Sequence, residues 1–168
     1  GAEHIAINPT NANDVWMSTS GRGLYRATLP TNAWTVVNET GLDNCANAAC
    51  GAISRYVRHR DLKFDSAGNL FITIFEMPFG TPADDNAGLY RRAAGGSTWA
   101  RSLAGPWVGN SGLNKVVQTS VTGWLALVNE TFPYLSGDNG VTFGTQLNDA
   151  TAPHTGFWRL YFKDASWN

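Results

Sequence analysis

Four carboxylates in two segments of this chain are its best candidates for acid–base chemistry. Glu76, Asp84 and Asp85 fall within residues 76–88, EMPFGTPADDNAG, and Glu130 opens the shorter segment ETFPY. Two carboxyl groups can cleave a glycosidic bond with retention of configuration at a separation of about 5–5.5 Å, or with inversion at about 6.5–9.5 Å. Glu76, Asp84 and Glu130 are therefore the candidate catalytic residues, and Asp85 is a candidate ligand-binding residue. Ordinary solvated surface acids are the alternative interpretation.

Aromatic and cationic residues accompany these carboxylates. Phe79 and Trp107 could offer a ring face to the C–H face of a sugar, or could anchor their own loops. Arg55 and Arg58, in RYVRHR, could hold a carboxylated sugar through paired hydrogen bonds, or could cap neighbouring elements. Tyr134 ends the segment ETFPY and completes the candidate ligand-binding set.

The two cysteines, Cys45 and Cys50, lie close together in DNCANAACGA. This spacing suits a local disulfide in an oxidising compartment, and two free thiols are the alternative. Because no cluster of His or Asp lies near them, we expect no zinc site, and we expect no cofactor.

The chain of 168 residues has a net charge of −1, and only 15% of its residues are charged. It has no long Lys/Arg run, so it lacks the basic footprint of a nucleic-acid binder. No apolar run approaches the roughly 20 residues that cross a bilayer, and the opening residues do not resemble a signal peptide. Frequent glycines and 12% aromatics favour short strands joined by tight turns. We therefore expect one all-β domain without a nucleic-acid partner or a membrane span.

One order of elements occurs three times, in copies that begin at His4, Asp61 and Lys115. Each copy has an alternating run, a polar turn, a hydrophobic run, a short third segment, and a last strand that begins at an aromatic. A repeat near 50 residues with four short strands is typical of a β-propeller blade. The predicted blades lie at about residues 4–40, 61–103 and 115–147, and a fourth begins at about 157–168.

A turn-rich hairpin joins the third and fourth predicted strands of each copy. In the third copy it reads SGDNGVTF, which resembles the Asp-box, S-x-D-x-G-x-T-W, of sialidases and secreted propeller glycosidases. The carboxylate is expected to accept backbone N–H groups, the glycine to take a positive φ, and the aromatic to pack between sheets. A carboxylate stabilised in this way transfers protons poorly, so the expected role is structural. The matching positions are Ser136, Asp138, Gly140, Thr142 and Phe143 in the third copy, Gly96, Thr98 and Trp99 in the second, and Trp34 in the first.

Nearly the whole chain is similar in its order of elements to xyloglucan-active propeller glycoside hydrolases. The segment IAINPTNANDVWMSTSGRGLYRA follows the pattern of their blades. In the resembled families the glycan cleft lies at the end of the blades opposite the Asp-box hairpins. The resemblance therefore places residues 76–88, residues 130–134 and the links between blades at a ligand-binding end. Those enzymes carry two propellers, and the sequence contexts of their catalytic carboxylates are not matched here.

The sequence thus predicts a secreted, carbohydrate-active propeller segment that binds a polysaccharide, as part of a glycoside hydrolase acting on xyloglucan or a related glucan. Whether the chain is itself an enzyme stays open, because a catalytic carboxylate could be supplied by residues outside it. A non-catalytic lectin or a structural protein is the alternative. Propellers typically have about four to eight blades, so further blades or a second copy of the chain are expected partners, through pairing of open strand edges.

Overall fold

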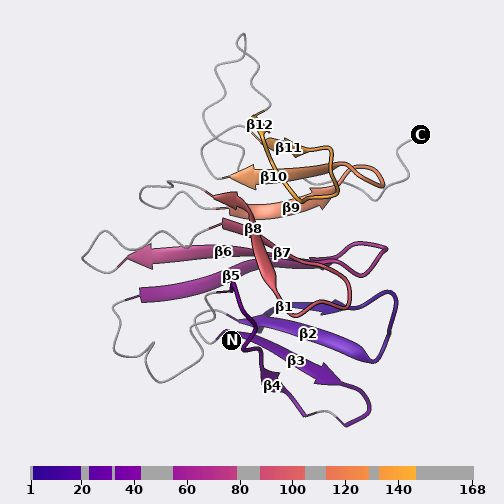
Figure 1. The fold of residues 1–168 in the computed structure, drawn as a ribbon. Coiled ribbons are helices and arrows are strands. Elements are labelled where there is room, and N and C mark those ends of the chain that lie inside the picture. The colour runs from indigo at the N-terminus through magenta and orange to yellow at the C-terminus, as the bar shows by residue number, and fades with distance from the viewer. Residues whose placement is uncertain are drawn as a thin grey trace.

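The computed structural model describes residues 2–19, 23–31, 33–42, 55–78, 88–104, 113–128 and 133–146. In these ranges the chain forms β-strands and no helix, so no helix there could cross a membrane (Figure 1). The strands are β1 Ala2–Ile7, β2 Asp14–Thr19, β3 Leu24–Thr28, β4 Thr35–Val36, β5 Arg55–Phe64, β6 Leu70–Pro78, β7 Gly88–Arg92, β8 Trp99–Ala104, β9 Leu113–Gln118, β10 Trp124–Val128, β11 Tyr134–Ser136 and β12 Thr145–Gln146.

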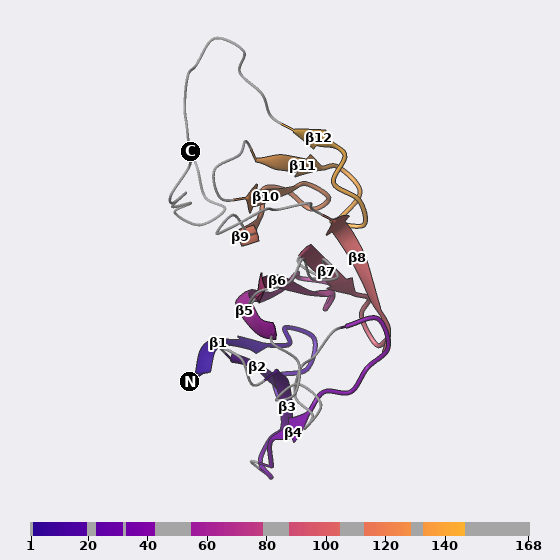
Figure 2. The same ribbon diagram turned by 90° about the vertical axis from the view of Figure 1, so that its left-hand side faces the viewer.

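The strands form three four-stranded antiparallel sheets, each in simple chain order. We call them blade 1 (β1–β4), blade 2 (β5–β8) and blade 3 (β9–β12). Figure 2 shows the three sheets layered on one another, with the first strands β1, β5 and β9 along one side and the last strands β4, β8 and β12 along the other. This arrangement confirms the predicted all-β fold built from propeller blades. The division of residues 1–168 into a single segment with a fourth blade stays a prediction.

Corresponding positions in the blades can be assigned from the pairing registers. A tyrosine of the third strand pairs with an apolar residue of the second strand in every blade. The pairs are Tyr25 with Met17, Tyr90 with Ile72, and Tyr134 with Ala126.

Strand β6 of the middle blade contains a nearly continuous apolar run, LFITIF. Successive side chains of a strand point to opposite faces. Leu70, Ile72 and Ile74 belong to the core shared with blade 1, and Phe71 belongs to the core shared with blade 3. Both faces of blade 2 are therefore buried along residues 70–74 of β6.

The core between blades 1 and 2 is built around two tryptophans. Trp16 of β2 and Trp99 of β8 are 0% and 3% exposed, and their rings meet edge to face with centroids 6.2 Å apart. Fully buried aliphatic side chains from both sheets, such as Leu24 and Ile72, fill the space around them. The segment after β4 also joins blade 2, because the Trp99 backbone N–H donates to the Thr40 carbonyl at 2.9 Å.

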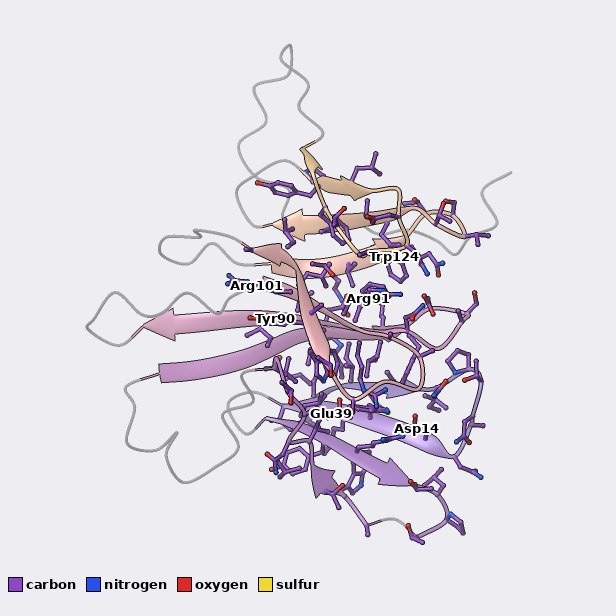
Figure 3. All side chains as sticks on the ribbon, viewed as in Figure 1. Asp14, Glu39, Tyr90, Arg91, Arg101 and Trp124 are labelled. Carbon is purple, nitrogen blue, oxygen red and sulfur yellow. The ribbon has the colours of Figure 1, made fainter. Side chains whose placement is uncertain are left out.

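The core between blades 2 and 3 contains a closer aromatic pair. The rings of Phe71 and Trp124 lie with their centroids 4.2 Å apart, and Val116 and Phe143 pack in the same cluster. In Figure 3 Trp124 lies between the second and third sheets. Gly140 also approaches blade 2, since a Cβ atom there would lie 2.4 Å from Cε1 of Phe71.

The hairpin between β11 and β12 is held by its own polar side chains. The Asp138 carboxylate accepts the Thr142 backbone N–H at 2.9 Å and the Thr142 hydroxyl at 2.6 Å. The Ser136 hydroxyl donates to Asp138 at 2.7 Å and accepts the Gly140 N–H at 3.0 Å. Asn139 and Gly140 have φ of 58° and 71°, the pair of left-handed residues that a tight hairpin turn needs. Asp138 therefore serves as the acceptor that closes this turn.

The aromatic residues of the three hairpins differ in burial. Trp99 and Phe143 are 3% and 7% exposed, each between two sheets, whereas Trp34 is 40% exposed. A hairpin aromatic is thus buried when its blade follows another blade in the stack.

Candidate functional site

One polar residue from the first strand of each blade occupies the same register position. Each lies opposite a residue of the neighbouring second strand. The pairs are His4 with Ser18, Asp61 with Thr73, and Lys115 with Leu127. We call His4, Asp61 and Lys115 the inner row, because β1, β5 and β9 share one side of the layered sheets (Figure 2).

The carboxylate of Asp61 is the centre of the inner row. It is 2% exposed, and its Oδ2 accepts the Val116 backbone N–H at 3.1 Å. His4 Nδ1 and Lys115 Nζ each lie 4.0 Å from Oδ1, and Lys63 Nζ lies 3.7 Å from Oδ2. A single buried anion is therefore surrounded by groups from all three blades.

Two lysines and a histidine surround the Asp61 carboxylate, and Asp65 is a second buried carboxylate nearby. The side chains of Lys63, Lys115 and His4 are 41%, 48% and 29% exposed, so they remain accessible from solvent. Lys63 also donates to the Val116 carbonyl at 3.0 Å, which fixes its position between blades 2 and 3. These three side chains therefore present N–H donors around a buried acceptor.

These groups lie in a hollow of about 480 Å³ across the first strands. Ligand pockets in proteins commonly measure about 300–1,000 Å³, so the hollow could accommodate one or two sugar-sized rings. Its lining residues are His4, Ile5, Ala6, Ile7, Pro9, Asp61, Leu62, Lys63, Phe64, Asp65, Ser66 and Lys115.

Asp65 is the second carboxylate of the hollow, and its oxygens are already engaged. Oδ1 accepts the backbone N–H groups of Ala67 and Asn69 at 3.0 and 2.8 Å, and Oδ2 accepts the Asn69 side-chain amide at 2.6 Å. These hydrogen bonds hold the Asp65 carboxylate within its own turn. Among the described lining residues, Asp61 and Asp65 are the two carboxylates.

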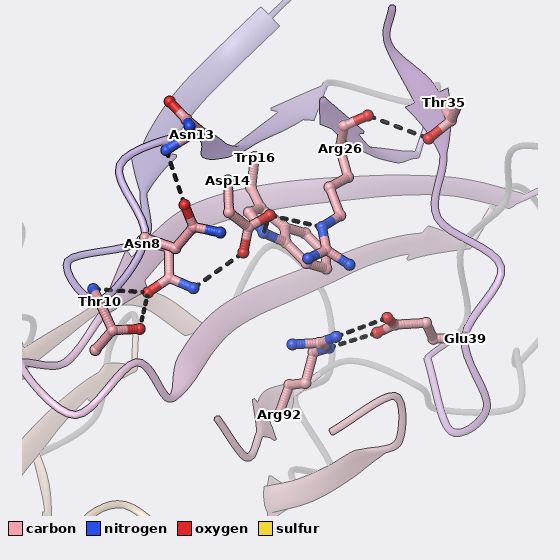
Figure 4. A network of polar contacts seen from close by, with 10 residues as sticks. Asn8, Thr10, Asn13, Asp14, Trp16, Arg26, Thr35, Glu39 and Arg92 are labelled. Carbon is pink, nitrogen blue, oxygen red and sulfur yellow. Dashed lines mark hydrogen bonds and ion pairs between the residues drawn. The ribbon is translucent and has the colours of Figure 1, made fainter. Parts of the chain in front are cut away.

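A second polar cluster links the strands of blade 1 (Figure 4). Burial raises the pKa of Asp14, but hydrogen bonds from Arg26, Asn8 and Trp16 outweigh it, and the net pKa lies below its usual value. Arg26 Nε donates to Asp14 at 2.6 Å, and the Trp16 indole donates at 3.0 Å. Asp14 is thus an acceptor that orients Trp16, and its role is structural.

Glu39 makes a similar link between blades 1 and 2. Its carboxylate accepts two hydrogen bonds from Arg92, at 2.7 and 3.0 Å, and one from the Trp99 indole at 2.8 Å. The Arg92 guanidinium also lies 5.0 Å from the ring centroid of Trp16. Figure 4 shows the paired contact between Arg92 and Glu39.

Most of the site residues predicted from sequence lie outside the described part of the chain. They are Phe79, Asp84, Asp85, Trp107 and Glu130, and the cysteines Cys45 and Cys50 lie outside it as well.

For three further candidates only the backbone is described. The register places Glu76 opposite Val57, and it places Arg58 and Arg55 opposite Phe75 and Pro78. The backbones of Arg55, Arg58 and Glu76 thus share one end of blade 2. The β5–β6 turn and the β7–β8 hairpin lie at its other end, where the Ala94 N–H donates to the Asn69 side chain.

Tyr134 was predicted to bind ligand, and the structure places it against the core between blades 2 and 3. It corresponds in register to Tyr90, which is 4% exposed in the core between blades 1 and 2. Tyr134 is partly buried there, and its role in ligand binding stays a prediction.

The inner row was not among the predicted site residues. A signal for it was present, because the three copies of the repeat begin at His4, Asp61 and Lys115. Equivalent positions at the start of each blade meet along the first strands, so these residues could have been grouped once a propeller was assumed.

No family model matches the sequence, and no curated protein matches it. Among solved structures, the fold is similar to that of an ancestral GH74 enzyme, with a TM-score of 0.54 and 13% sequence identity. The match covers 85% of this chain and 18% of the other, so this chain spans about a fifth of that enzyme's length. The described chain therefore shares its fold with part of that enzyme.

Proposed function

We propose that this chain is a secreted propeller segment that binds a polysaccharide across its inner row, as part of a glycoside hydrolase directed at xyloglucan or a related glucan. The observation that carries this proposal is the hollow of about 480 Å³ in which three blades bring donors and an acceptor together. Similarity of fold to a GH74 enzyme supports the choice of a glycan as ligand.

The chemistry of the hollow suits a sugar better than an apolar ligand. Sugar hydroxyls both donate and accept hydrogen bonds. The Lys63 and Lys115 ammonium groups can donate to hydroxyl oxygens, and the Asp61 carboxylate can accept. Phe64, which is partly exposed, adds apolar surface beside them, which suits the C–H face of a pyranose.

Removal of the lysine charges tests the binding proposal. We expect Lys115→Met and Lys63→Met each to weaken binding of xyloglucan oligosaccharides about tenfold, because each loses a hydrogen bond from a charged donor, worth about 1.5–3 kcal/mol. Titration calorimetry measures the change. Lys115→Arg retains the charge, and Val121→Ser changes a residue that is 83% exposed outside the hollow. Unchanged affinity in both methionine variants would exclude the inner row as the binding site.

Turnover distinguishes an enzyme from a lectin. Because Asp65 is engaged in its turn, hydrolysis by this chain would depend on Glu76, Asp84 or Glu130. If the chain is an enzyme, release of reducing ends from xyloglucan or mixed-linkage glucan should be lost in Glu76→Gln, Asp84→Asn or Glu130→Gln. Binding without turnover in the unmodified chain favours the lectin, for which the engagement of Asp65 is the supporting observation.

A further inference from the structure

Blade 1 leaves exposed a face whose counterparts in blades 2 and 3 are buried. Ile5, Leu62 and Val116 occupy the same position in the first strands, since they pair with Met17, Ile72 and Ala126. Leu62 and Val116 are 4% and 0% exposed, whereas Ile5 is 63% exposed. The same residue position is therefore core in two blades and surface in the first.

Two other residues of blade 1 repeat this pattern. Ile7 corresponds to Phe64, because they pair with Val15 and Leu70. Phe64 packs against the core between blades 1 and 2, and Ile7 is 57% exposed. Trp34 is 40% exposed, while the hairpin aromatics of blades 2 and 3 are buried.

Strand alternation shows which face these residues occupy. Ala6 belongs to the core shared with blade 2, so its neighbours Ile5 and Ile7 point away from blade 2. Val15 and Ala27 are already buried, at 7% and 2% exposure. The exposed part of this face is therefore formed by Ile5 and Ile7 of β1 and by Trp34 of the β3–β4 hairpin. We call these three residues the blade-1 patch.

Blade 3 exposes an apolar residue on the face that points away from blade 2. Tyr134 packs toward blade 2, so the next residue, Leu135, points away from blade 2 and is 37% exposed. Leu135 pairs with Leu125, at the register position that Arg91 has opposite Phe71 in blade 2. In blade 2 this face receives the following blade.

We propose that the blade-1 patch binds blade 3 of a second copy of this chain, head to tail. The two internal contacts between blades provide the template. In each of them, the face of one blade that points toward the later blade packs on the face of the next blade that points toward the earlier one. Reciprocal contacts between two copies would join the three described blades of each copy into six, a number within the usual range of about four to eight. Contacts of this heterologous kind form rings when the rotation closes. Ile5 and Ile7 of the patch also line the hollow, so the two proposals are tested through residues that they do not share: the lysines for the glycan, and Trp34 and Leu135 for the second copy.

The mass of the chain in solution tests the contact. Native mass spectrometry should find a species of twice 18.1 kDa. Trp34→Lys and Leu135→Lys should each give monomers, with the dimer dissociation constant raised at least about 100-fold. Both side chains are partly exposed, and an unchanged circular dichroism spectrum verifies folding. Ile5→Lys provides a second variant on the patch.

Mixing the two monomeric variants tests the head-to-tail direction. The Trp34→Lys chain retains its blade-3 face, and the Leu135→Lys chain retains its blade-1 patch. We therefore expect the mixture to form a heterodimer through one contact, although neither variant forms a dimer alone. An unmodified chain that stays monomeric at about 50 μM, a concentration at which a micromolar interface would be occupied, would overturn the proposal. A Leu135→Lys chain that still forms dimers by itself would overturn it as well, because patch-to-patch contact would then be sufficient.

Discussion

Both contacts between blades combine an apolar core with polar links, and they differ in the residues that join the sheets most closely. Between blades 1 and 2, Glu39 joins the Arg92 guanidinium and the Trp99 indole through three hydrogen bonds. Between blades 2 and 3, the Phe71 and Trp124 rings pack with centroids 4.2 Å apart, and Gly140 permits the close approach. The register of a blade therefore does not dictate how the blade attaches to its neighbour.

The two contacts should also respond differently to substitution. An apolar contact loses energy in proportion to the volume removed from it. A buried ion pair behaves otherwise, because removing one partner leaves the other charge without compensation. The loss of stability on substitution should therefore follow the volume removed at the apolar pair and the loss of a counter-charge at the ion pair.

The largest effect is expected for Phe71→Ala. Phe71 is 0% exposed and contacts Trp124, and truncation of a buried Phe to Ala commonly costs about 3–5 kcal/mol. Urea unfolding measures the loss. Hydrogen exchange should accelerate in β10 and β11 more than in β2 and β3. Phe71→Leu, which retains most of the volume, should cost less than half as much, and equal losses for the two variants would argue against a packing contact.

A smaller effect is expected for Glu39→Gln. The side chains of Arg92 and Glu39 are 8% and 15% exposed, so the guanidinium would lose its counter-charge in a largely buried position, at a cost of about 3 kcal/mol. Hydrogen exchange at the Trp99 amide, which donates to the Thr40 carbonyl, should accelerate. In a double-mutant cycle, Arg92→Met combined with Glu39→Gln should cost less than the sum of the two single changes. Additive losses would contradict direct coupling.

The blade fold could be predicted from sequence because its signals are local. Short strands, polar turns and hairpin aromatics recur in order, and each hairpin depends on a few neighbouring residues. The contacts of Asp138 reach only from Ser136 to Thr142, so a short motif can indicate them. The exposure of Trp34 could not be predicted in this way, because burial of a hairpin aromatic depends on the presence of a preceding blade.

The inner row is harder to recognise, because only the repeat as a whole, and no local motif, groups its residues. His4, Asp61 and Lys115 are separated by more than 50 residues, and each alone resembles an ordinary polar residue at the start of a strand. Their proximity depends on the registers of three separate sheets and on the stacking of those sheets. Long-range geometry of this kind leaves no local motif.

The smallest effect is expected for Asp138→Asn, which tests the carboxylate in the β11–β12 hairpin. Hydrogen bonds from the Thr142 hydroxyl and backbone N–H, followed by the Ser136 hydroxyl, lower the pKa of Asp138 from 3.8 to about 2. The carboxylate is exposed to solvent, so its loss should cost at most about 1 kcal/mol at pH 7.

The lowered pKa of Asp138 also fixes the direction of the pH dependence. A group whose pKa is lower in the folded state than in the unfolded state stabilises the fold above its unfolded value, and this stabilisation is lost as the pH falls toward the folded value. The free energy of unfolding of the unmodified chain should therefore exceed that of the Asp138→Asn variant above pH 4, and the difference should shrink between pH 4 and pH 2. Thermal unfolding of both proteins across this range measures it. Phe71→Ala is the control, because its loss of stability involves no titrating group and should not follow this trend. If the difference in stability between the unmodified chain and the Asp138→Asn variant stays constant from pH 7 to pH 2, the carboxylate charge does not hold the turn.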